Sequence, residues 1–253
     1  MTQRTLIGGL QAVQSALRYD PTRAIEAWVD RRRRDARLQK VREQLEGIGC
    51  PVQESDAKAL GRLLPDVSHQ GVVLAYQGTS PRGDAELGEH LDRLNHAPFL
   101  LILDQVQDPH NLGACLRTAD AAGVDAVIAP RDRAVGLTPV VHRIAAGAAE
   151  AMPFYQVTNL ARCLRGLRDR GIWLVGAADE AAEPLSQADF TGPLAVALGA
   201  EGKGLRRLTR EHCDTLIAIP MAGHVESLNV SVAAGVLLFE AVRQRGAFMA
   251  APP

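Results

Sequence analysis

Three small polar side chains cluster in one short tract near the C-terminus: Ser227, Asn229 and Ser231. They follow an apolar run that ends at Ile219, and they precede a largely apolar stretch, residues 230–242, with helical spacing. A helix start carries unpaired N–H donors, and a loop exposes further backbone donors and acceptors. Such a tract suits recognition of a purine edge or the holding of a polar substrate. Because Asn and Ser also cap helices, plain N-capping is the competing interpretation.

A second polar loop, residues 104–113, opens the segment that carries Arg117. Pro109 suits the first turn of a helix, and Asp108 suits the cap before it. The pattern therefore predicts a strand, a polar loop and then a helix that presents Arg117.

A third loop, residues 198–204, places Glu201 among three glycines, Gly199, Gly202 and Gly204. Glycine permits positive φ angles and close approach of the backbone to a ligand. The carboxylate is therefore well exposed for chemistry. The spacing matches neither the dinucleotide fingerprint nor the Walker A motif, although a nucleotide-binding enzyme built on this loop stays an alternative.

From Phe99 onward, short apolar strands alternate with helices. The predicted strands are Phe99–Leu103, Ala126–Ala129, Phe154–Val157, Ile172–Ala177, Leu194–Leu198 and Leu216–Ile219. The predicted helices are Asn111–Ala122, Pro139–Ala149, Asn159–Arg170, Leu205–Glu211 and Asn229–Arg243. This alternation indicates an α/β fold with a parallel sheet covered on both faces. Ligands of such sheets bind beyond the carboxyl ends of the strands, where all three loops begin.

The first 77 residues read as a separate, small α/β domain. Its predicted helices are Gly9–Arg18, Arg34–Glu46 and Asp56–Leu63, and its predicted strands are Ile25–Val29, a segment after Pro51, and Val72–Tyr76. Residues 78–96, which begin with a run of turn formers, are the predicted linker. Residues 97–253 form the second predicted domain.

The composition and the absence of certain sequence patterns exclude several classes of protein. The chain has 253 residues, of which 47% are hydrophobic and 23% charged, as expected for a globular protein with ample core. No apolar run approaches the length of a membrane span, and no signal-peptide pattern opens the chain. The cysteines are widely separated and the histidines lack ligand spacing, so we expect reduced core thiols, no metal site and a cytoplasmic location.

The formal net charge of −1 argues against a uniformly basic nucleic-acid binder, but the charge is uneven. Seven basic residues and a single acid, Asp35, lie between Arg31 and Arg42. Phosphate contacts act over a Debye length of about 8–10 Å, so local density matters more than the sum. An RNA-contacting surface and a solvated helix face both fit this run. The same two interpretations apply to Lys203, Arg206 and Arg207.

Together the three loops resemble the SpoU family of S-adenosylmethionine-dependent RNA ribose 2′-O-methyltransferases, over roughly residues 97–245. Residues 108–117 look like the first motif of that family, residues 198–202 like the second, and residues 219–231 like the third. All three occur in order and at the family spacing. The resemblance implies a trefoil-knotted SPOUT fold for the parallel-sheet domain.

The N-terminal domain adds a finer resemblance. Ile7-Gly8-Gly9 with Ala12-Val13, and later His69-Gln70-Gly71-Val72, are similar to the substrate-binding domain of the RlmB-like subgroup. That subgroup methylates a guanosine in the peptidyl-tRNA-binding loop of large-subunit (23S) ribosomal RNA. The resemblance therefore implies an RNA partner, as naked ribosomal RNA or as a large-subunit assembly intermediate.

The resemblance also implies roles for individual residues. The expected catalytic group is Arg117, Asn111, Glu201, Ser227 and Asn229, and the expected S-adenosylmethionine site is Gly199, Ile219 and Leu228. Because a guanidinium pKa exceeds about 12, Arg117 suits phosphate binding and ribose orientation better than proton abstraction. Glu201 is expected to hold Arg117 or position the substrate.

Three alternatives stay open at this stage. Members of the family work as homodimers, and the apolar last helix fits either a subunit interface or a monomer core. A transfer-RNA ribose methylase is the nearest alternative activity. A non-catalytic RNA-binding or ribosome-assembly protein of the same fold is the alternative from another class.

Overall fold

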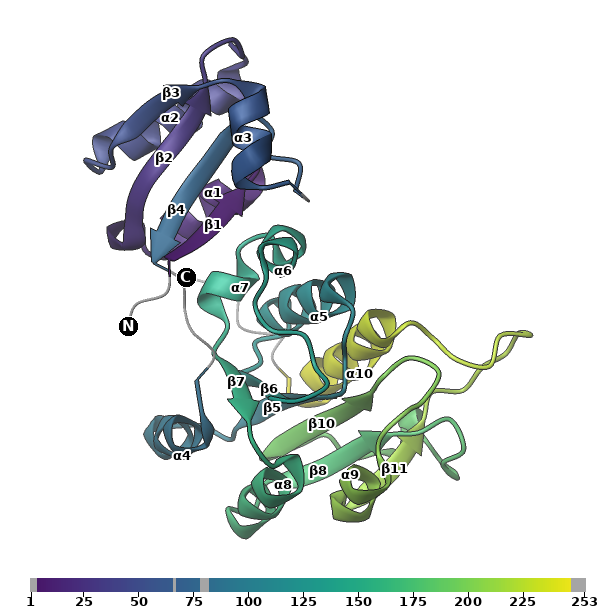
Figure 1. Cartoon of the computed structure of the whole chain (residues 1–253). Coiled ribbons are helices and arrows are strands. Elements are labelled where there is room, and N and C mark those ends of the chain that lie inside the picture. Colours follow the sequence, from purple (N-terminus) through teal and green to yellow (C-terminus); the bar gives the residue numbers. More distant parts are fainter. Residues whose placement is uncertain (1–3, 66, 78–81, 247–253) are drawn as a thin grey trace. The chain divides into compact units, whose positions relative to one another are not determined.

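The computed structural model describes residues 4–65, 67–77 and 82–246 (Figure 1). These residues form two compact units. The first contains the described residues up to Gln77 together with Leu137–Ala151, and the second contains the rest. The sequence pattern assigned 137–151 to the second domain, and residues 78–81 of the predicted linker lie outside the described ranges.

The first unit is built on a four-stranded sheet. Its strands, in spatial order, are β1 (Arg4–Gly8), β4 (Val72–Gln77), β2 (Ala24–Asp30) and β3 (Val52–Ser55). The pairs β1–β4 and β4–β2 are antiparallel, and β2–β3 is parallel. Its helices are α1 (Leu10–Tyr19), α2 (Ala36–Gly47), α3 (Ala57–Leu63), α6 (Pro139–Ala145) and α7 (Ala148–Ala151), with a 3-10 turn at Pro21–Arg23.

Each face of this sheet carries its own apolar cluster. Helices α1 and α2 cover one face with fully buried side chains such as Val13, Val41 and Leu45. Helix α3 covers the other face through Leu60. The alternation of strand residues between the two clusters follows from the period-two geometry of a strand.

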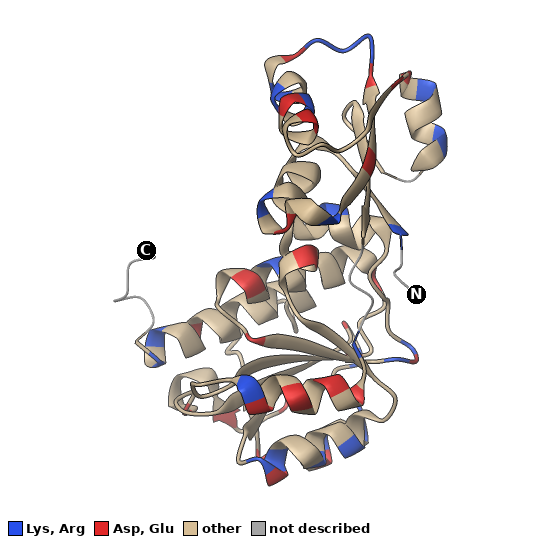
Figure 2. Ribbon diagram, turned by 90° about the vertical axis from the view of Figure 1, so that its left-hand side faces the viewer, with Lys and Arg blue, Asp and Glu red and all other residues tan. Residues whose placement is uncertain are grey.

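Two predictions for this unit need correction. The predicted basic helix begins later, at Ala36, because Asp35 accepts a hydrogen bond from Leu38 N (3.1 Å) and caps it. Residues 31–34 therefore form an exposed loop between β2 and α2, and Figure 2 shows this loop in the colour of Lys and Arg. The predicted helix 139–149 is broken into α6 and α7 at Ala146 (φ 52°) and Gly147 (φ 105°).

Gly147 explains why the break is tolerated. A Cβ at this position would lie 2.1 Å from the Ser15 Cβ of α1, so only glycine permits the close approach. The chain thus returns to the first unit, where α6 contacts β1 and α7 contacts α1.

The second unit confirms the predicted parallel α/β architecture. Its sheet runs in the order β7 (Phe154–Val157), β6 (Ala126–Pro130), β5 (Phe99–Asp104), β10 (Leu194–Gly199), β8 (Trp173–Ala177), β11 (Thr215–Ala218) and β9 (Glu183–Pro184). Every one of these pairings is parallel. The short edge strand β9 was not predicted, since two residues carry no periodicity.

Helices cover both faces of this sheet (Figure 1). They are α4 (Asp84–Arg93), α5 (Pro109–Ala121), α8 (Leu160–Asp169), α9 (Arg207–His212) and α10 (Val230–Gln244), with a 3-10 turn at Leu185–Gln187. Helices α5 and α10 pack together on one face, and α8 and α9 lie on the other. Helix α4 occupies the predicted linker and joins the α8-side core through Leu87 and Leu91.

Strands β5 and β10 are neighbours in space although Phe99 and Leu194 pair across a long stretch of chain. The register pairs Asp104 with Gly199, so the loops that follow these two strands start side by side. The trefoil knot implied by the family resemblance stays a prediction.

Two of the four cysteines, Cys50 and Cys115, are buried, whereas Cys163 and Cys213 are half-buried. Cys50, Cys115, Cys163 and Cys213 are all free thiols, and burial raises the pKa of the Cys115 thiol to about 12. Within the described ranges, no helix is both long and apolar enough to span a membrane.

Candidate functional site

Asp104, at the carboxyl end of β5, organises this edge of the sheet. Its carboxylate is fully buried and accepts hydrogen bonds from Arg206 N (3.0 Å) and Thr209 Oγ1 (2.7 Å). The Arg206 guanidinium donates from Nε to the other carboxylate oxygen, Asp104 Oδ1, at 2.7 Å. Strand β5 is thereby tied to the start of α9, which fixes the two ends of the glycine loop after β10.

The glycine loop folds into a tight turn. Gly204 N donates to Ala200 O (2.8 Å), and Gly202 and Gly204 have φ angles of 72° and 62°. Gly199 is required for another reason, because a Cβ there would lie 1.9 Å from the Gly204 carbonyl carbon. The loop therefore closes on itself only when residue 199 lacks a side chain, and it then presents Glu201 outward.

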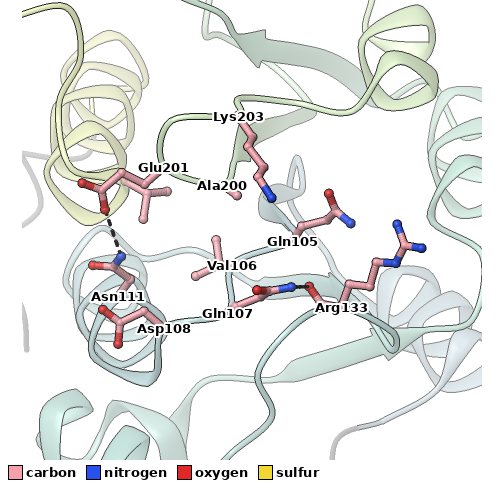
Figure 3. A pocket seen from close by; sticks show the side chains of 10 residues that line it. Gln105, Val106, Gln107, Asp108, Asn111, Arg133, Ala200, Glu201 and Lys203 are labelled. Atoms are coloured by element: carbon pink, nitrogen blue, oxygen red, sulfur yellow. Dashed lines mark hydrogen bonds between the residues drawn. The ribbon is translucent and has the colours of Figure 1, made fainter.

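Three predicted site residues meet across three loops: Asn111 at the start of α5, Glu201 in the glycine loop and Asn229 at the start of α10. Asn229 Nδ2 donates to Asn111 Oδ1 (2.9 Å) and to Glu201 Oε2 (3.3 Å). Asn111 Nδ2 donates to the same carboxylate oxygen at 3.5 Å (Figure 3). Asn229 Oδ1 meanwhile accepts from Ser231 N (2.9 Å). Asn229 thus caps α10 and joins the loops, so the two interpretations of this residue are compatible.

The cluster borders a cavity of about 340 Å³ at the ends of β5, β6 and β10. Gln105, Asn111, Arg133, Glu201 and Lys203 line it (Figure 3). Gln105 (φ 65°) and Arg133 (φ 59°) both have left-handed backbone conformations, which side chains larger than glycine rarely adopt. Strain of this kind gathers at binding sites when surrounding bonds hold it in place.

A second cavity, of about 270 Å³, shares Glu201 and Lys203 with the first. The predicted cofactor residues Gly199, Ile219 and Leu228 all line it, as does Ser227. Its walls combine apolar side chains such as Met221 and Leu228 with the glycine loop and with charged side chains such as Glu180 and Arg210. That lining suits an adenine ring, which needs an apolar slot and nearby backbone donors and acceptors, so the residues present fit S-adenosylmethionine.

Arg117 lies apart from these contacts. It is exposed on α5, it is not among the residues that line either cavity, and Glu201 bonds to Asn111 and Asn229 instead. The helix explains this separation, because six residues at about 100° each place Arg117 roughly 120° around α5 from Asn111.

Sequence reasoning missed two residues of the site. Asp104 ends an apolar strand and was read only as the start of a loop, although a carboxylate at a strand end is a signal that could have been used. Arg133 follows β6 in a loop without any motif, and its place beside the cavity depends on long-range packing. Gln107 Nε2 donates to Arg133 O (3.3 Å), and Val135 N donates to Val106 O (3.0 Å), which hold the two loops together.

No group of three or more His, Cys, Asp or Glu side chains is placed to hold a metal ion in the part of the chain that the structure describes.

Comparisons with known proteins match this architecture. A family model described as the SpoU rRNA methylase family matches residues 98–239, and one for RNA 2′-O ribose methyltransferase substrate binding matches residues 6–81. The chain is 52% identical over 245 residues to a 23S rRNA (guanosine-2′-O-)-methyltransferase RlmB from Shewanella oneidensis, covering 97% of this chain and 99% of that protein. It is 54% identical over 241 residues to the protein of that name from Pectobacterium atrosepticum, covering 95% and 98%.

Among solved structures, the SpoU methyltransferase AviRb from Streptomyces viridochromogenes, in complex with AdoMet, superimposes with a TM-score of 0.80. The two chains are 26% identical, and the match covers 95% of this chain and 90% of the other. Both the full-length relatives and the matched catalytic module lead to one conclusion: the chain belongs to the SpoU rRNA methylase family.

Proposed function

We propose that this protein transfers a methyl group from S-adenosylmethionine to the ribose 2′-oxygen of a guanosine in 23S ribosomal RNA. The observation that carries this proposal is the convergence of three loops on the Asn111–Glu201–Asn229 cluster, beside a cavity lined by Gly199, Ile219 and Leu228. The full-length relatives named for that activity support the same substrate.

The proposed division of labour follows the two cavities. The 270 Å³ cavity binds S-adenosylmethionine, which supplies an electrophilic methyl group on a sulfonium sulfur. The 340 Å³ cavity receives the target ribose, with Glu201 lining both cavities and Asn111 bonded to Glu201 on the ribose side. The chain then accelerates transfer chiefly by holding the 2′-oxygen in line with the methyl carbon, because near-attack positioning alone accounts for large rate factors.

Bound S-adenosylmethionine would supply the methyl group to the 2′-oxygen and leave as neutral S-adenosylhomocysteine, and the hydroxyl proton would pass to solvent. The Arg117 guanidinium binds the adjacent phosphate and orients the ribose, a task that suits its planar set of donors. Ser227 and Asn229 fix the third loop around both ligands.

The proposed role of Arg117 would be met in a homodimer. Val232, Val236 and Phe239 form a stripe on α10 with exposed fractions of 51%, 37% and 39%. Helix α5, which carries Arg117, packs beside α10. We propose that a second copy of the chain covers this stripe, so that Arg117 of one subunit serves the cavity of the other.

The ribosomal target is favoured over transfer RNA because the rRNA-methylating relatives match nearly the whole chain, including the substrate-binding module. We also propose a cytoplasmic location, a target in the peptidyl-tRNA-binding loop, and either free RNA or an assembly intermediate as substrate.

Primer extension at low nucleotide concentration tests the activity. Ribosomal RNA from a strain lacking this protein should lose one ribose-methyl stop, and the wild-type gene should restore it. Arg117→Ala and Asn229→Ala should fail to restore the stop, whereas Arg165→Ala, an exposed arginine on α8 outside both cavities, should restore it. Normal methylation by Arg117→Ala would contradict the assigned role of Arg117. An unchanged stop in the deletion strain would contradict the activity itself.

A further inference from the structure

A third cavity, of about 480 Å³, opens at the same carboxyl edge of the sheet, beyond β6 and β7. Residues after these two strands and residues at the start of α9 line it. Neither the cofactor nor the target ribose accounts for this space, since both already have cavities of their own.

Arg133 connects this cavity to the ribose cavity, because the same residue lines both. Its loop is held by the bonds from Gln107 and Val135 described above, so the left-handed backbone at Arg133 is fixed in place. Figure 3 shows the Arg133 side chain extending away from Gln107, and within the described residues its guanidinium has no carboxylate within ion-pair distance. The Arg133 guanidinium is therefore available to bind a phosphate group of an RNA backbone that extends from one cavity to the other.

The lining of the cavity suits a nucleobase. Leu208 leaves 48% of its surface exposed there, and Pro130, Leu160 and Ala161 add further apolar surface. Thr158 and Asn159 supply polar groups beside it. A flat base can stack on an apolar and guanidinium surface without strict sequence preference.

The charges around the cavity are mostly neutralised within the protein. Arg206 is bound to buried Asp104, and Arg207 pairs with Glu211 at 2.5 Å. Asp132 and Arg133 also line the cavity, and their opposite charges offset each other, so the lining is close to electrically balanced. This balance favours a nucleoside with one phosphate contact over a cluster of phosphates.

We propose that this cavity is a second nucleotide subsite. It holds the base of the nucleotide next to the target guanosine, while Arg133 contacts the phosphodiester between the two. The inference rests on the proposed RNA methylation and adds to it a residue-level means of recognising the neighbouring nucleotide.

The test uses a short RNA substrate and two versions of it, in which the nucleotide on the 5′ or the 3′ side of the methylated guanosine is abasic. One of the two abasic RNAs should lower kcat/KM of the wild-type protein about tenfold. Leu208→Asn should lower kcat/KM about tenfold on intact RNA and respond no further to that abasic position. Such non-additive losses would show that the Leu208 side chain and the missing base contact each other.

Arg133→Ala should raise KM for RNA about tenfold while its calorimetric affinity for S-adenosylmethionine stays at the wild-type value. Arg165→Ala removes an exposed arginine of α8 outside this cavity and should leave both quantities unchanged. Because Leu208 is half exposed, its variant should retain the wild-type melting temperature.

Equal rates on all three RNAs, or additive losses in Leu208→Asn, would overturn the subsite while leaving the methylation intact. Absence of methylation on every RNA by the wild-type protein would overturn the proposed function and the subsite with it.

Discussion

Asn229 shows how one side chain can serve both the fold and the chemistry. Its Oδ1 accepts from a backbone N–H of the first turn of α10, so the other end of the amide must be the donor that faces Asn111 and Glu201. Replacing the amide by a carboxylate would keep the helix cap, but it would put an acceptor where Asn229 now donates to Asn111 and Glu201.

We therefore expect Asn229→Asp to fold normally, since Asp is as good an N-cap as Asn. Its new oxygen would face Glu201 Oε2, now 3.3 Å from Nδ2, and the two carboxylates would repel each other. This repulsion should displace the loops that carry residues 201 and 229, and we expect kcat/KM of the variant to fall about 100-fold. Methylation kinetics with a melting curve checks this, and near-normal turnover would show that the contact between the loops is dispensable.

Asp104 should matter more for stability than for contact with any ligand. Asp104→Ala leaves the buried Thr209 hydroxyl and the Arg206 backbone N–H without their acceptor, and we expect a loss of about 3–5 kcal/mol in the free energy of unfolding. Urea denaturation measures this loss. Asp92→Ala is the control, because the Asp92–Arg170 pair lies on the surface and should contribute less than about 1 kcal/mol.

At the scale of the elements, the loops are positioned by strand register and by the absence of side chains. Asp104 and Gly199 are paired neighbours on β5 and β10, so two of the three site loops leave the sheet at the same level. The turn after Gly199 then returns the backbone onto Gly199 itself.

Gly199→Ala should consequently abolish S-adenosylmethionine binding, because the added Cβ would overlap the backbone at Gly204 and Leu205. Calorimetric titration with the cofactor measures the effect. Gly166→Ala provides the matched control: this exposed glycine of α8 has open space around it, and alanine should stabilise the helix by about 0.5–1 kcal/mol. Wild-type affinity in Gly199→Ala would mean that the loop can open without losing the site.

At the scale of the whole molecule, the chain divides into two compact units. The second unit holds the candidate cavities, and the first unit matches the substrate-binding family model. We therefore expect the exposed arginine loop of the first unit (Figure 2) to contact an RNA backbone.

The double variant Arg32→Ala/Arg34→Ala should raise KM for RNA and reduce the slope of log affinity against log salt by about 2, with kcat unchanged. RNA binding measured across a salt series checks this. Arg42→Ala removes a charge from the same basic run, but its guanidinium already pairs with Glu46 (2.8 Å) and Glu54 (3.1 Å), so it should change the slope less. Equal salt slopes for the double variant and the wild type would show that the arginine loop faces solvent and does not contact RNA.

Much of the fold was predictable because its signals are local. Apolar runs such as Phe99–Leu103 and Leu194–Leu198 carry strand periodicity, and caps such as Asp108 mark helix starts, so strand and helix positions mostly agree within a few residues. The errors also have local causes. Helix α2 begins after the arginine run because Asp35 caps it. The helix predicted over residues 139–149 is interrupted because Gly147 has a positive φ angle.

The sequence by itself determined the alternation of strands and helices, the three polar loops and the residue types within them, since these depend on near neighbours along the chain. Only the tertiary structure decided that residues 137–151 return to the first unit, that Asp104 ties β5 to α9, and that Arg133 stands between two cavities. These contacts join segments that are remote along the chain, and their stability depends on packing and strand order, which no local pattern records.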